Sequence, residues 1–457
     1  MGTVGINFGS INSGTGFDVA STVTQILAIN QQIETPWKTQ LAALKAQDTV
    51  FTTLGTDLST LTTKMQALTD FSGVLSEKQG ASSNTNVLAL TGATPSAVAG
   101  SHTITVNSLA QTSSNYSNTV AHAADVLSGS LTIQVGSGTP STITVGSSSN
   151  TLATLSAAIN AAGVGVTATV ISDTSGSRLS LVSATGGAAG QLTITSALSD
   201  TTSASSLSFV SGQTGQNGSV TVDGIALSTP SNTVTDAIPG VTFDMLAAAP
   251  GTPVQVQITN NNSAVATAVN DFVTAYNTVV GDINTQEGKD ANGNPQPLFG
   301  NATLSLIQNQ LSTALLGGSA SGTVSSVTQL GISTNNDGTL TLDSNALLAE
   351  LNNHYSDVTG FLQNANSFGL NFSSVLNGLG TQAPSGDVYL SQQQNAAEEA
   401  TLNQSITNED AMIATEKTSL TAELNTANQI LQSIPSQVNQ INEVYSAVTG
   451  YNTTPTG

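Results

Sequence analysis

The stretch that decides the fold is VASTVTQILAINQQIETPWKTQLAALKAQDTVFTTLGTDLSTLTTKMQAL, residues 19–68. Steps of four and three residues from Val19 visit fifteen positions, of which only Asn30, Gln40 and Gln47 are polar. An apolar repeat of about 3.5 residues forms a narrow seam that must pack against another helix. The stretch therefore predicts a long helix that needs a helical partner.

A second apolar repeat lies at the opposite end of the chain. The same steps run from Ile406 to Val448 and are interrupted only by Asp410 and Lys417. Between the two repeats, apolar residues alternate with Ser and Thr, as in half-buried antiparallel strands. We therefore expect an α+β multidomain fold, in which both chain ends form a helical, coiled-coil-like stem and antiparallel β-rich head domains are inserted between them.

Charge is scarce in this chain and is mostly negative. Charged residues make up 8% of the 457 residues, against about 25% in ordinary globular domains. Seven basic and 28 acidic residues give a net charge of −21. Binding to nucleic acid or to anionic lipid is therefore not expected, since both require clustered Lys and Arg.

The sequence shows no cysteine, no membrane span and no Sec-type signal peptide. The absence of cysteine excludes disulfides, thiolate metal sites and a cysteine nucleophile. No stretch approaches the roughly 20 apolar residues of a membrane span. The first eighteen residues, MGTVGINFGSINSGTGFD, lack the basic and apolar regions of a Sec-type signal peptide. We expect either a cytoplasmic protein or export by another route.

Prolines are expected to interrupt both seams. Asp18 is a plausible N-cap for the first helix. Thr35 and Pro36 are expected to divide that helix, with Thr35 as the cap of a second helix and Pro36 at its first position. Pro435 is expected to kink or split the C-terminal helix.

The middle of the chain contains further local signals. TLATLSAAINAA (151–162) predicts a short helix ended by Gly163, and the polar run at 199–218 predicts a loop or domain boundary. Helical spacing returns from Ser263, with another helix near 304–315. The stretch LGISTNNDGTLTLDSNALLAEL (330–351) predicts a hairpin turning at Asp337-Gly338, then a helix capped near Asp343 or Ser344.

Side chains suited to catalysis or metal binding are few. His102, His122 and His354 lie far apart in the sequence, and surface or structural roles are favoured for them. The loop at 290–294 has the oxygen spacing of the first ligands of a calcium loop, but no Glu occupies the twelfth position. We expect a solvated loop there, and we predict no catalytic site, no cofactor and no metal.

Blocks of sequence along nearly the whole chain resemble one known family. They are SGTGFDVASTVTQILAINQQIETP (13–36), GSHTITVNSLAQ (100–111), SNTVTDAIPGVTFDM (231–245), FVTAYN (272–277), PLFGNATLSLI (297–307) and LGISTNNDGTLTLD (330–343). In this order they resemble the flagellar filament-capping proteins, the hook-associated protein 2 family. The segment 151–183 also resembles the "IN" motif of flagellin and hook proteins, centred on Ile159-Asn160.

The resemblance implies a structural cap at the distal end of the bacterial flagellar filament. Such a cap promotes folding and insertion of exported flagellin and prevents its loss. The implied route is secretion through the flagellar export apparatus to the extracellular tip of the flagellum. The implied partners are further copies of the chain in a ring, with a pentamer as one candidate, together with flagellin, the hook–filament junction protein and the flagellar export chaperone.

Other interpretations remain open from the sequence. Another axial protein, either flagellin or the hook–filament junction protein, would share heptad ends and low charge, although blocks 231–245 and 330–343 argue against it. A surface adhesin whose β head binds glycans or mucin is a second alternative. An enzyme is disfavoured, because no set of nucleophile, base and metal ligands is found.

The same patterns set the predicted domain limits. We expect the following order: a terminal leg at 1–40, the stem's N-terminal part at 41–79, the first part of a β head at 80–118, a second β head with the IN motif at 119–215, the second part of the first head at 216–262, the stem's C-terminal part at 263–430 and another terminal leg at 431–457.

The seam residues are expected to have two roles. The stem core within one subunit is predicted to comprise Leu44, Phe51, Leu54, Leu58, Leu61, Leu68, Leu420, Leu424 and Leu431. The interface with other subunits or with the filament is predicted to comprise Val19, Val23, Ile26, Ile33, Val438, Ile441, Tyr445 and Val448, which lie toward the termini. The polar seam residues Asn30, Gln40 and Gln47 are expected to fix the register and the choice of partner.

Overall fold

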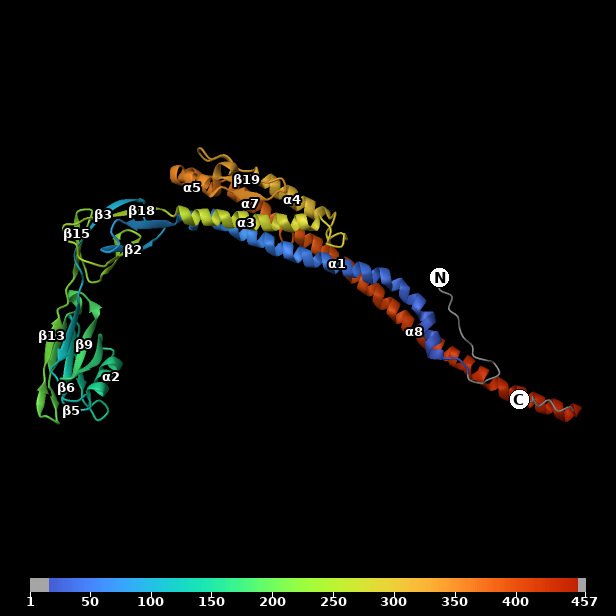
Figure 1. Cartoon of the computed structure of the whole chain (residues 1–457), viewed down its shortest axis with the longest axis horizontal. Coiled ribbons are helices and arrows are strands. Elements are labelled where there is room, and N and C mark those ends of the chain that lie inside the picture. Colours follow the sequence, from blue (N-terminus) through green and yellow to red (C-terminus); the bar gives the residue numbers. More distant parts are fainter. Residues whose placement is uncertain (1–15, 451–457) are drawn as a thin grey trace. The chain divides into compact units, whose positions relative to one another are not determined.

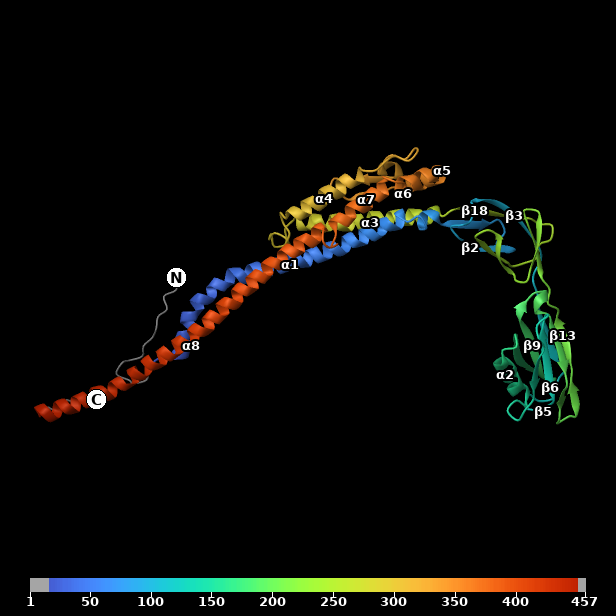
Figure 2. The same ribbon diagram turned by 180° about the vertical axis from the view of Figure 1, so that it is seen from behind.

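The computed structural model describes residues 16–450, which form two compact units (Figures 1 and 2). Within the described range, the helical unit combines residues 16–69 and 268–450, from the two ends of the chain. The β-rich unit consists of residues 70–267. The predicted fold class is confirmed, because the β-rich segment is inserted between two helical chain ends.

The helical unit is dominated by two long helices. Its helices are α1 (Val19–Thr69), α3 (Asn262–Gln286), α4 (Ala302–Leu315), α5 (Ser344–Asn353), α6 (Tyr355–Gln363), α7 (Phe368–Leu379) and α8 (Asp387–Thr449). The start of α1 agrees with the predicted cap, since the carboxylate of Asp18 accepts the N–H of Ser21 at 3.2 Å. Helices α6 and α7 were not predicted from the sequence.

Neither proline ends its helix. α1 continues through Pro36 and α8 continues through Pro435, so the predicted division at Thr35-Pro36 is wrong, and of the kink or split predicted at Pro435 the split does not occur. A proline inside a helix removes one backbone hydrogen bond and costs about 3 kcal/mol. In α1, Val23 before Pro36 and Leu44 after it are both buried, so helix packing on both sides of the proline offsets that local cost.

The region between α4 and α5 contains a short hairpin. β19 (Ile332–Thr334) pairs with β20 (Leu340–Leu342) around the Asp337-Gly338 turn, as predicted. The Asp343 carboxylate then caps α5 by accepting the N–H groups of Asn345 at 2.9 Å and Ala346 at 3.2 Å. Elsewhere in the helical unit, a cluster of aromatic rings joins α3, α6 and α7: Phe272, Tyr276, Phe361, Phe368 and Phe372.

The first part of the β-rich unit has its own core. Its strands are β1 (Lys78–Ser82), β2 (Leu88–Ala93), β3 (Gly100–Ser108), β14 (Gly218–Val222), β15 (Ile225–Thr229), β16 (Thr233–Ile238), β17 (Val241–Met245) and β18 (Val254–Asn260). They form antiparallel sheets in the orders β1-β18-β3-β14-β15 and β16-β17-β2. Alternate residues such as Ile104, Val106 and Phe243 are fully buried between them.

The second part of the β-rich unit encloses a separate core. Its elements are β4 (Thr112–Ser117), β5 (Leu127–Ser128), β6 (Ser130–Val135), β7 (Ser141–Thr144), α2 (Leu152–Ala162), β8 (Val166–Asp173), β9 (Gly176–Gly186), β10 (Leu192–Ser196), β11 (Leu198–Asp200), β12 (Ser205–Leu207) and β13 (Phe209–Gln213). The sheet orders are β13-β4-β9-β8, β10-β6-β7 and β12-β11-β5.

The polar run at 199–218 was predicted to be a loop or a domain boundary; it is not a loop, but it does contain the passage from β13, which packs on one core of the β-rich unit, to β14, which belongs to the other. It contains the end of β11 and the whole of β12 and β13. These strands are short and Ser-rich, so only single residues such as Leu198 and Leu207 supply buried apolar surface. β12 has one apolar residue, and the two of β13, Phe209 and Val210, are adjacent, so neither strand shows the alternation by which a strand is predicted.

The IN motif supplies a helix that completes the edge of a sheet. α2 begins at the Thr151 capping box and ends at Gly163 in the left-handed conformation, as predicted. Asn160 accepts the N–H of Ala168 at 2.7 Å and donates to its carbonyl at 2.8 Å. Ala168 lies on β8, which has a strand neighbour on one side only. The Asn160 amide therefore takes the place of a second neighbouring strand.

We expect Asn160→Ala to destabilise the β-rich unit, because it leaves the N–H of Ala168 without its partner and leaves the C=O of Ala168 with only the hydroxyl of Ser156 as a donor. The expected loss is about 1 kcal/mol, the usual net value of such hydrogen bonds. Urea unfolding of the full chain, followed by a spectroscopic probe on the β-rich unit, measures it. Ala157→Ser on the exposed face of α2 is the control. An Asn160→Ala midpoint equal to that of the control would refute the role assigned to the motif.

Candidate functional site

The two longest helices, α1 and α8, lie side by side and run in opposite directions (Figures 1 and 2). Just before α1, the N–H of Phe17 donates to Oδ1 of Asn428 at 2.9 Å. Further along, Nε2 of Gln392 donates to Oγ1 of Thr52 at 3.1 Å. Early residues of α1 thus meet late residues of α8, and each chain end supplies the helical partner that the other requires.

The α1 part of the predicted stem core is buried inside the helical unit. Leu58 and Leu61 are 0% exposed. The full set is buried within this single chain: Leu44, Phe51, Leu54, Leu58, Leu61 and Leu68. Since truncating one buried Leu to Ala costs about 2–5 kcal/mol, this segment anchors α1 firmly to the rest of the helical unit.

The α8 part of the predicted stem core meets a different stretch of α1. Leu420, Leu424 and Leu431 are half-buried and do not lie beside Leu44–Leu68. Together with Ile413 they pack on residues from the start of the chain, and we call this group the terminal cluster: Phe17, Val19, Val23, Leu27, Ile413, Leu420, Leu424 and Leu431. The antiparallel pairing explains this placement, because a heptad pattern does not encode the offset between two helices.

Two residues predicted for contacts between molecules are instead buried within the chain. Val19 is 9% exposed and Val23 is 2% exposed, both in the terminal cluster. Their partner is α8 of the same chain, which reaches far enough to cover them. Ile26 is half-buried and Ile33 is 50% exposed, so of these four predicted residues Ile33 has the most free surface.

The last part of α8 continues the seam past the start of α1. Its large apolar side chains are exposed: Val438 (47%), Ile441 (67%), Val444 (63%), Tyr445 (52%) and Val448 (79%). We call these five residues the terminal stripe. Their spacing of three and four residues places them on one face of the helix. This face therefore has the residue pattern of a coiled-coil seam, and its apolar side chains are accessible to a partner.

Polar residues of the α1 seam are paired with α8. Nδ2 of Asn30 donates to Glu416 at 2.6 Å, and Nε2 of Gln40 donates to Glu398 at 2.5 Å. Further along, Gln47 and its neighbour Asp48 both accept from Nδ2 of Asn395, at 3.5 Å and 2.9 Å. The three polar residues singled out in the sequence thus all face α8. A polar group in a seam favours the one register in which its partner is opposite.

A buried carboxylate lies between the terminal cluster and the stem core. The side chain of Glu34 is 3% exposed and Lys38 donates to it at 2.5 Å. This hydrogen bond lowers the pKa of Glu34 and raises the pKa of Lys38. The other Glu34 oxygen, Oε1, is buried without a partner among the described residues. Sequence reasoning missed this pair, because Glu34 does not occupy a seam position.

Two carboxyl groups approach one another between α1 and α3. Partial burial raises the pKa of Asp57 to about 6, and the neighbouring Asp282 raises it in the same direction. Asp282 also lines a small cavity of about 140 Å³ with Val50, Leu54 and Ile283. Two carboxylates in one low-dielectric site repel one another, so the pair is held most firmly when it shares a proton.

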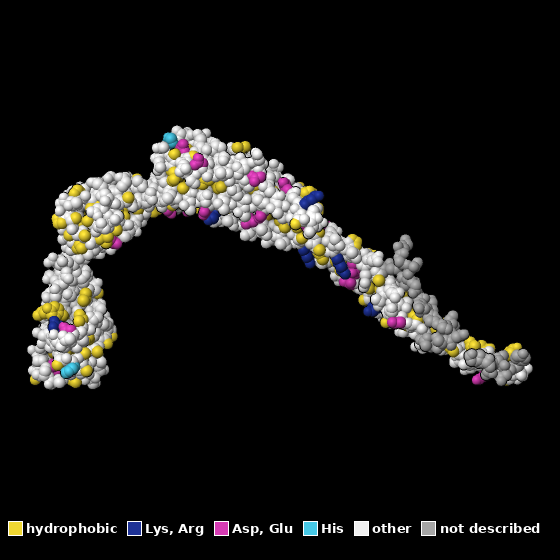
Figure 3. All heavy atoms as spheres, in the orientation of Figure 1, with side chains coloured by type: hydrophobic (Ala, Val, Ile, Leu, Met, Phe, Trp, Pro, Cys, Tyr) yellow, Lys and Arg dark blue, Asp and Glu magenta, His cyan; other side chains and the backbone are white. Residues whose placement is uncertain are grey.

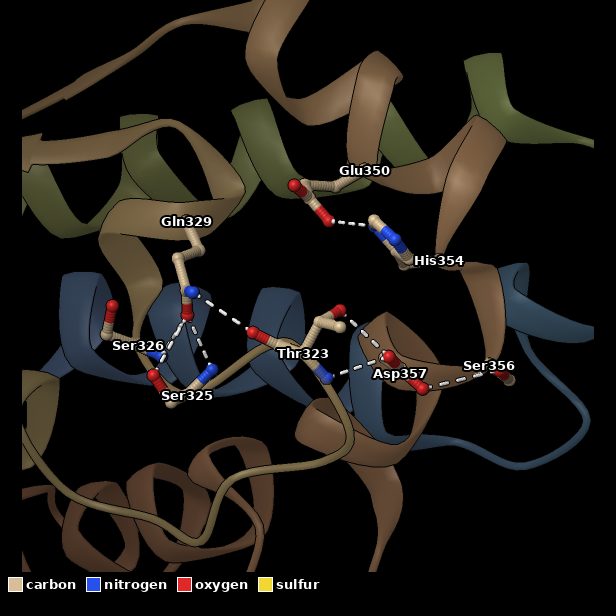
Figure 4. A network of polar contacts seen from close by, with 8 residues as sticks. All are labelled: Thr323, Ser325, Ser326, Gln329, Glu350, His354, Ser356 and Asp357. Atoms are coloured by element: carbon tan, nitrogen blue, oxygen red, sulfur yellow. Dashed lines mark hydrogen bonds and ion pairs between the residues drawn. The ribbon is translucent and has the colours of Figure 1, made fainter.

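Figure 4 shows a polar network that closes the loop before η3 (Val327–Leu330). Thr323 donates its N–H and its hydroxyl to the carboxylate of Asp357 at 2.8 and 2.9 Å. These bonds lower the pKa of Asp357. Gln329 accepts the N–H of Ser325 at 2.6 Å, and its amide donates to the carbonyl of Thr323 at 3.0 Å. Every partner is within the loop or the adjacent helix, so the network stabilises the loop.

The other candidate side chains have structural partners too. His102 lies 2.7 Å from Asp223, and His354 lies 2.8 Å from Glu350. Asp290 accepts the N–H groups of Asn292 and Asn294 at 2.9 and 2.8 Å, so its carboxylate is turned into its own loop. Within residues 16–450, no three His, Cys, Asp or Glu side chains are grouped to hold a metal ion.

Sequence models of one family match most of the chain. The model described as flagellar hook-associated protein 2 N-terminus matches residues 15–113, and the one described as flagellar hook-associated protein 2 C-terminus matches residues 215–449. None of the helices in the described range combines the length and the apolarity needed to span a membrane.

Known relatives carry the same name. The chain is 34% identical over 352 residues to the B-type flagellar hook-associated protein 2 of Pseudomonas aeruginosa, covering 70% of this chain and 74% of that protein. It is 28% identical over 372 residues to flagellar hook-associated protein 2 of Escherichia coli K12, covering 76% and 79%. The crystal structure of the D1-D2-D3 domains of the E. coli flagellar cap protein FliD matches with a TM-score of 0.58 and 28% identity, covering 76% of this chain and 99% of that one.

The Asp57–Asp282 pair predicts a stability that falls as the pH rises. Because the pKa of Asp57 is about 6 in the folded chain against an ordinary 3.8, the folded state binds more protons between these values. Stability is therefore lost as the pH rises through that window. We expect Asp57→Asn to raise the melting temperature at pH 7 and to leave it unchanged at pH 3.5, measured by circular dichroism of the helical unit.

Glu443→Gln, an exposed change of the same type on α8, is the control for this experiment. It removes one negative charge without touching the carboxyl pair. Equal effects of Asp57→Asn and Glu443→Gln at pH 7 would show that the pair is not the source of the pH dependence.

Proposed function

The chain belongs to the flagellar hook-associated protein 2 family, the structural caps of the flagellar filament, and we propose that its paired terminal helices hold the filament. Its place is the tip of the bacterial flagellum. The two other interpretations, another axial protein or a glycan-binding adhesin, find no support in the compared proteins.

The terminal stripe is the observation that carries this proposal. Its five large apolar residues are 47–79% exposed. Burial of such apolar surface would stabilise a protein by about 25 cal/mol per Å². An exposed apolar row that continues an internal coiled-coil seam indicates a helical partner from another chain. Axial segments of the filament are partners of this chemistry.

The further partners follow from family membership. We propose that copies of the chain form a ring at the filament tip, and that the ring promotes folding and insertion of flagellin and prevents its loss. The hook–filament junction protein would be its neighbour before the filament grows, and the export chaperone would hold the chain before secretion. A chain without cysteine suits this route, since no disulfide has to form or open during transit.

We expect the variant Val438→Ser/Ile441→Ser/Tyr445→Ser to fold and to be exported, yet to fail as a cap. The substituted side chains are already exposed, so the fold loses little, whereas the partner loses its apolar contact. Cells with this variant as their only cap should swim poorly, carry short filaments and release flagellin into the medium. Filament length by electron microscopy and flagellin in the culture supernatant measure the effect.

Ile225→Ser, at an equally exposed position (66%) in the β-rich unit, is the matched control and should leave filaments normal. Deletion of residues 1–35 or 436–457 provides a stronger form of the same test. Filaments of full length, with no flagellin released by either the triple variant or the deletions, would show that the terminal helices do not hold the filament.

A further inference from the structure

The β-rich unit has a sheet with one buried and one exposed face. The sheet is the four-stranded β13-β4-β9-β8. Its inner face carries Leu179 and Leu181, which are both 0% exposed. Residues next to them in the strand point outward, because successive side chains in a strand alternate between faces. Such an outer face usually carries Ser and Thr that interact with water.

Large apolar side chains interrupt this polar outer face. Val210 on β13 is the direct cross-strand partner of Tyr116 on β4, and they are 49% and 38% exposed. Tyr116 is in turn opposite Ser180 on β9, and Val182, two residues further along the same strand, is 38% exposed. Direct cross-strand partners share a face, with Cβ atoms about 5 Å apart. Three strands therefore contribute to one apolar patch.

The Tyr116 ring lies beside a glycine in this patch. A Cβ placed on Gly212 would lie 3.2 Å from Cδ1 of the Tyr116 ring, so the ring occupies space that a side chain at this position would need. The glycine on β13 therefore leaves room for the ring within the patch.

The only arginine of the chain borders the same patch. Arg178 on β9 is the cross-strand partner of Ile171 on β8, which is 57% exposed. Asp173 follows two residues after Ile171 and is exposed on the same face. Nε of Arg178 is buried and has no hydrogen-bond partner among the described residues.

The charges of this face make it complementary to itself. We call the set Tyr116, Ile171, Asp173, Arg178, Val182 and Val210 the head face. We propose that the head face binds the head face of a second copy of this chain around a two-fold axis, so that each Arg178 meets the partner's Asp173. In a two-fold contact, residue i of one copy faces residue j of the other, and residue j faces residue i. One cation and one anion on the face, Arg178 and Asp173, can therefore form two ion pairs.

The chain's overall charge supports a second copy as the occupant. At a net charge of −21, two copies repel one another over most of their surface. The head face is neutral as a set, with one cation, one anion and four apolar side chains, so repulsion is low there. Tyr and Arg are also the residues that contribute most binding energy at protein interfaces. Residues 116–210 lie between the segments matched by the two family models, and this contact is independent of filament holding by the terminal helices.

A charge swap in the full-length chain tests this contact. We expect Arg178→Asp and Asp173→Arg each to weaken self-association at least tenfold, because each places like charges opposite one another. The double variant Arg178→Asp/Asp173→Arg should restore association, since the pair is exchanged but still complementary. Sedimentation velocity over a range of protein concentrations measures the dissociation constant. Ile225→Ser, on another sheet, is the control and should not change it.

Unchanged association in both single variants would overturn the proposal, as would a double variant that stays as weak as the single ones. Both outcomes are separable from loss of filament holding, because the terminal-stripe variant Val438→Ser/Ile441→Ser/Tyr445→Ser retains the head face. That variant should associate like the wild type in the same experiment.

Discussion

The antiparallel packing of α1 on α8 is the contact on which the rest of the structure depends. Phe17 and Asn428 are 411 positions apart in the sequence, yet they are joined by one hydrogen bond. Closing so long a loop costs entropy, and the buried seam must repay it. The inserted β-rich unit adds little to this cost, because its first strand β1 pairs with its last strand β18. Its two connections to the helical unit are therefore adjacent.

Amides and carboxylates, not Lys–Glu pairs, give this helix pair its specificity. A chain with seven basic residues cannot set its register with many ion pairs. Asn30 and Gln40 instead donate to Glu416 and Glu398 across the seam. Such bonds depend on a donor at the correct position along the helix. Because the donor is uncharged, they are also less sensitive to salt than a pair of opposite charges would be.

The sequence predicted the features that depend on a short-range pattern. The heptad repeats, the cap at Asp18, the helix end at Gly163, and the hairpin at Asp337-Gly338 were all predicted correctly, since each depends on neighbours a few residues away. The offset between α1 and α8 could not be predicted, because a repeat of about 3.5 residues fits several registers equally. Burial of Val19 within the chain follows from that offset.

Other errors had separate physical causes. The helix was predicted to divide at Pro36, but it continues through the proline. The free energy of packing the helix before and after Pro36 exceeds the local cost of the proline. β12 and β13 were missed, because neither strand has apolar residues in alternation: β12 has one, and the two of β13 are adjacent. The Glu34–Lys38 pair and the Asp57–Asp282 pair were missed as well. Both depend on how deeply a helix face is buried, which the sequence does not state.

The two exposed apolar surfaces show how an acidic chain with few charges can still assemble. Charged side chains are sparse on the face of the molecule drawn in Figure 3. The terminal stripe itself contains no charged side chain, although Glu443 lies between two of its residues, and in the head face Arg178 is balanced by Asp173. Because the stripe belongs to the helical unit and the head face to the β-rich unit, either contact can form without the other. A chain of this kind can therefore bind a helical partner with one unit and a copy of itself with the other.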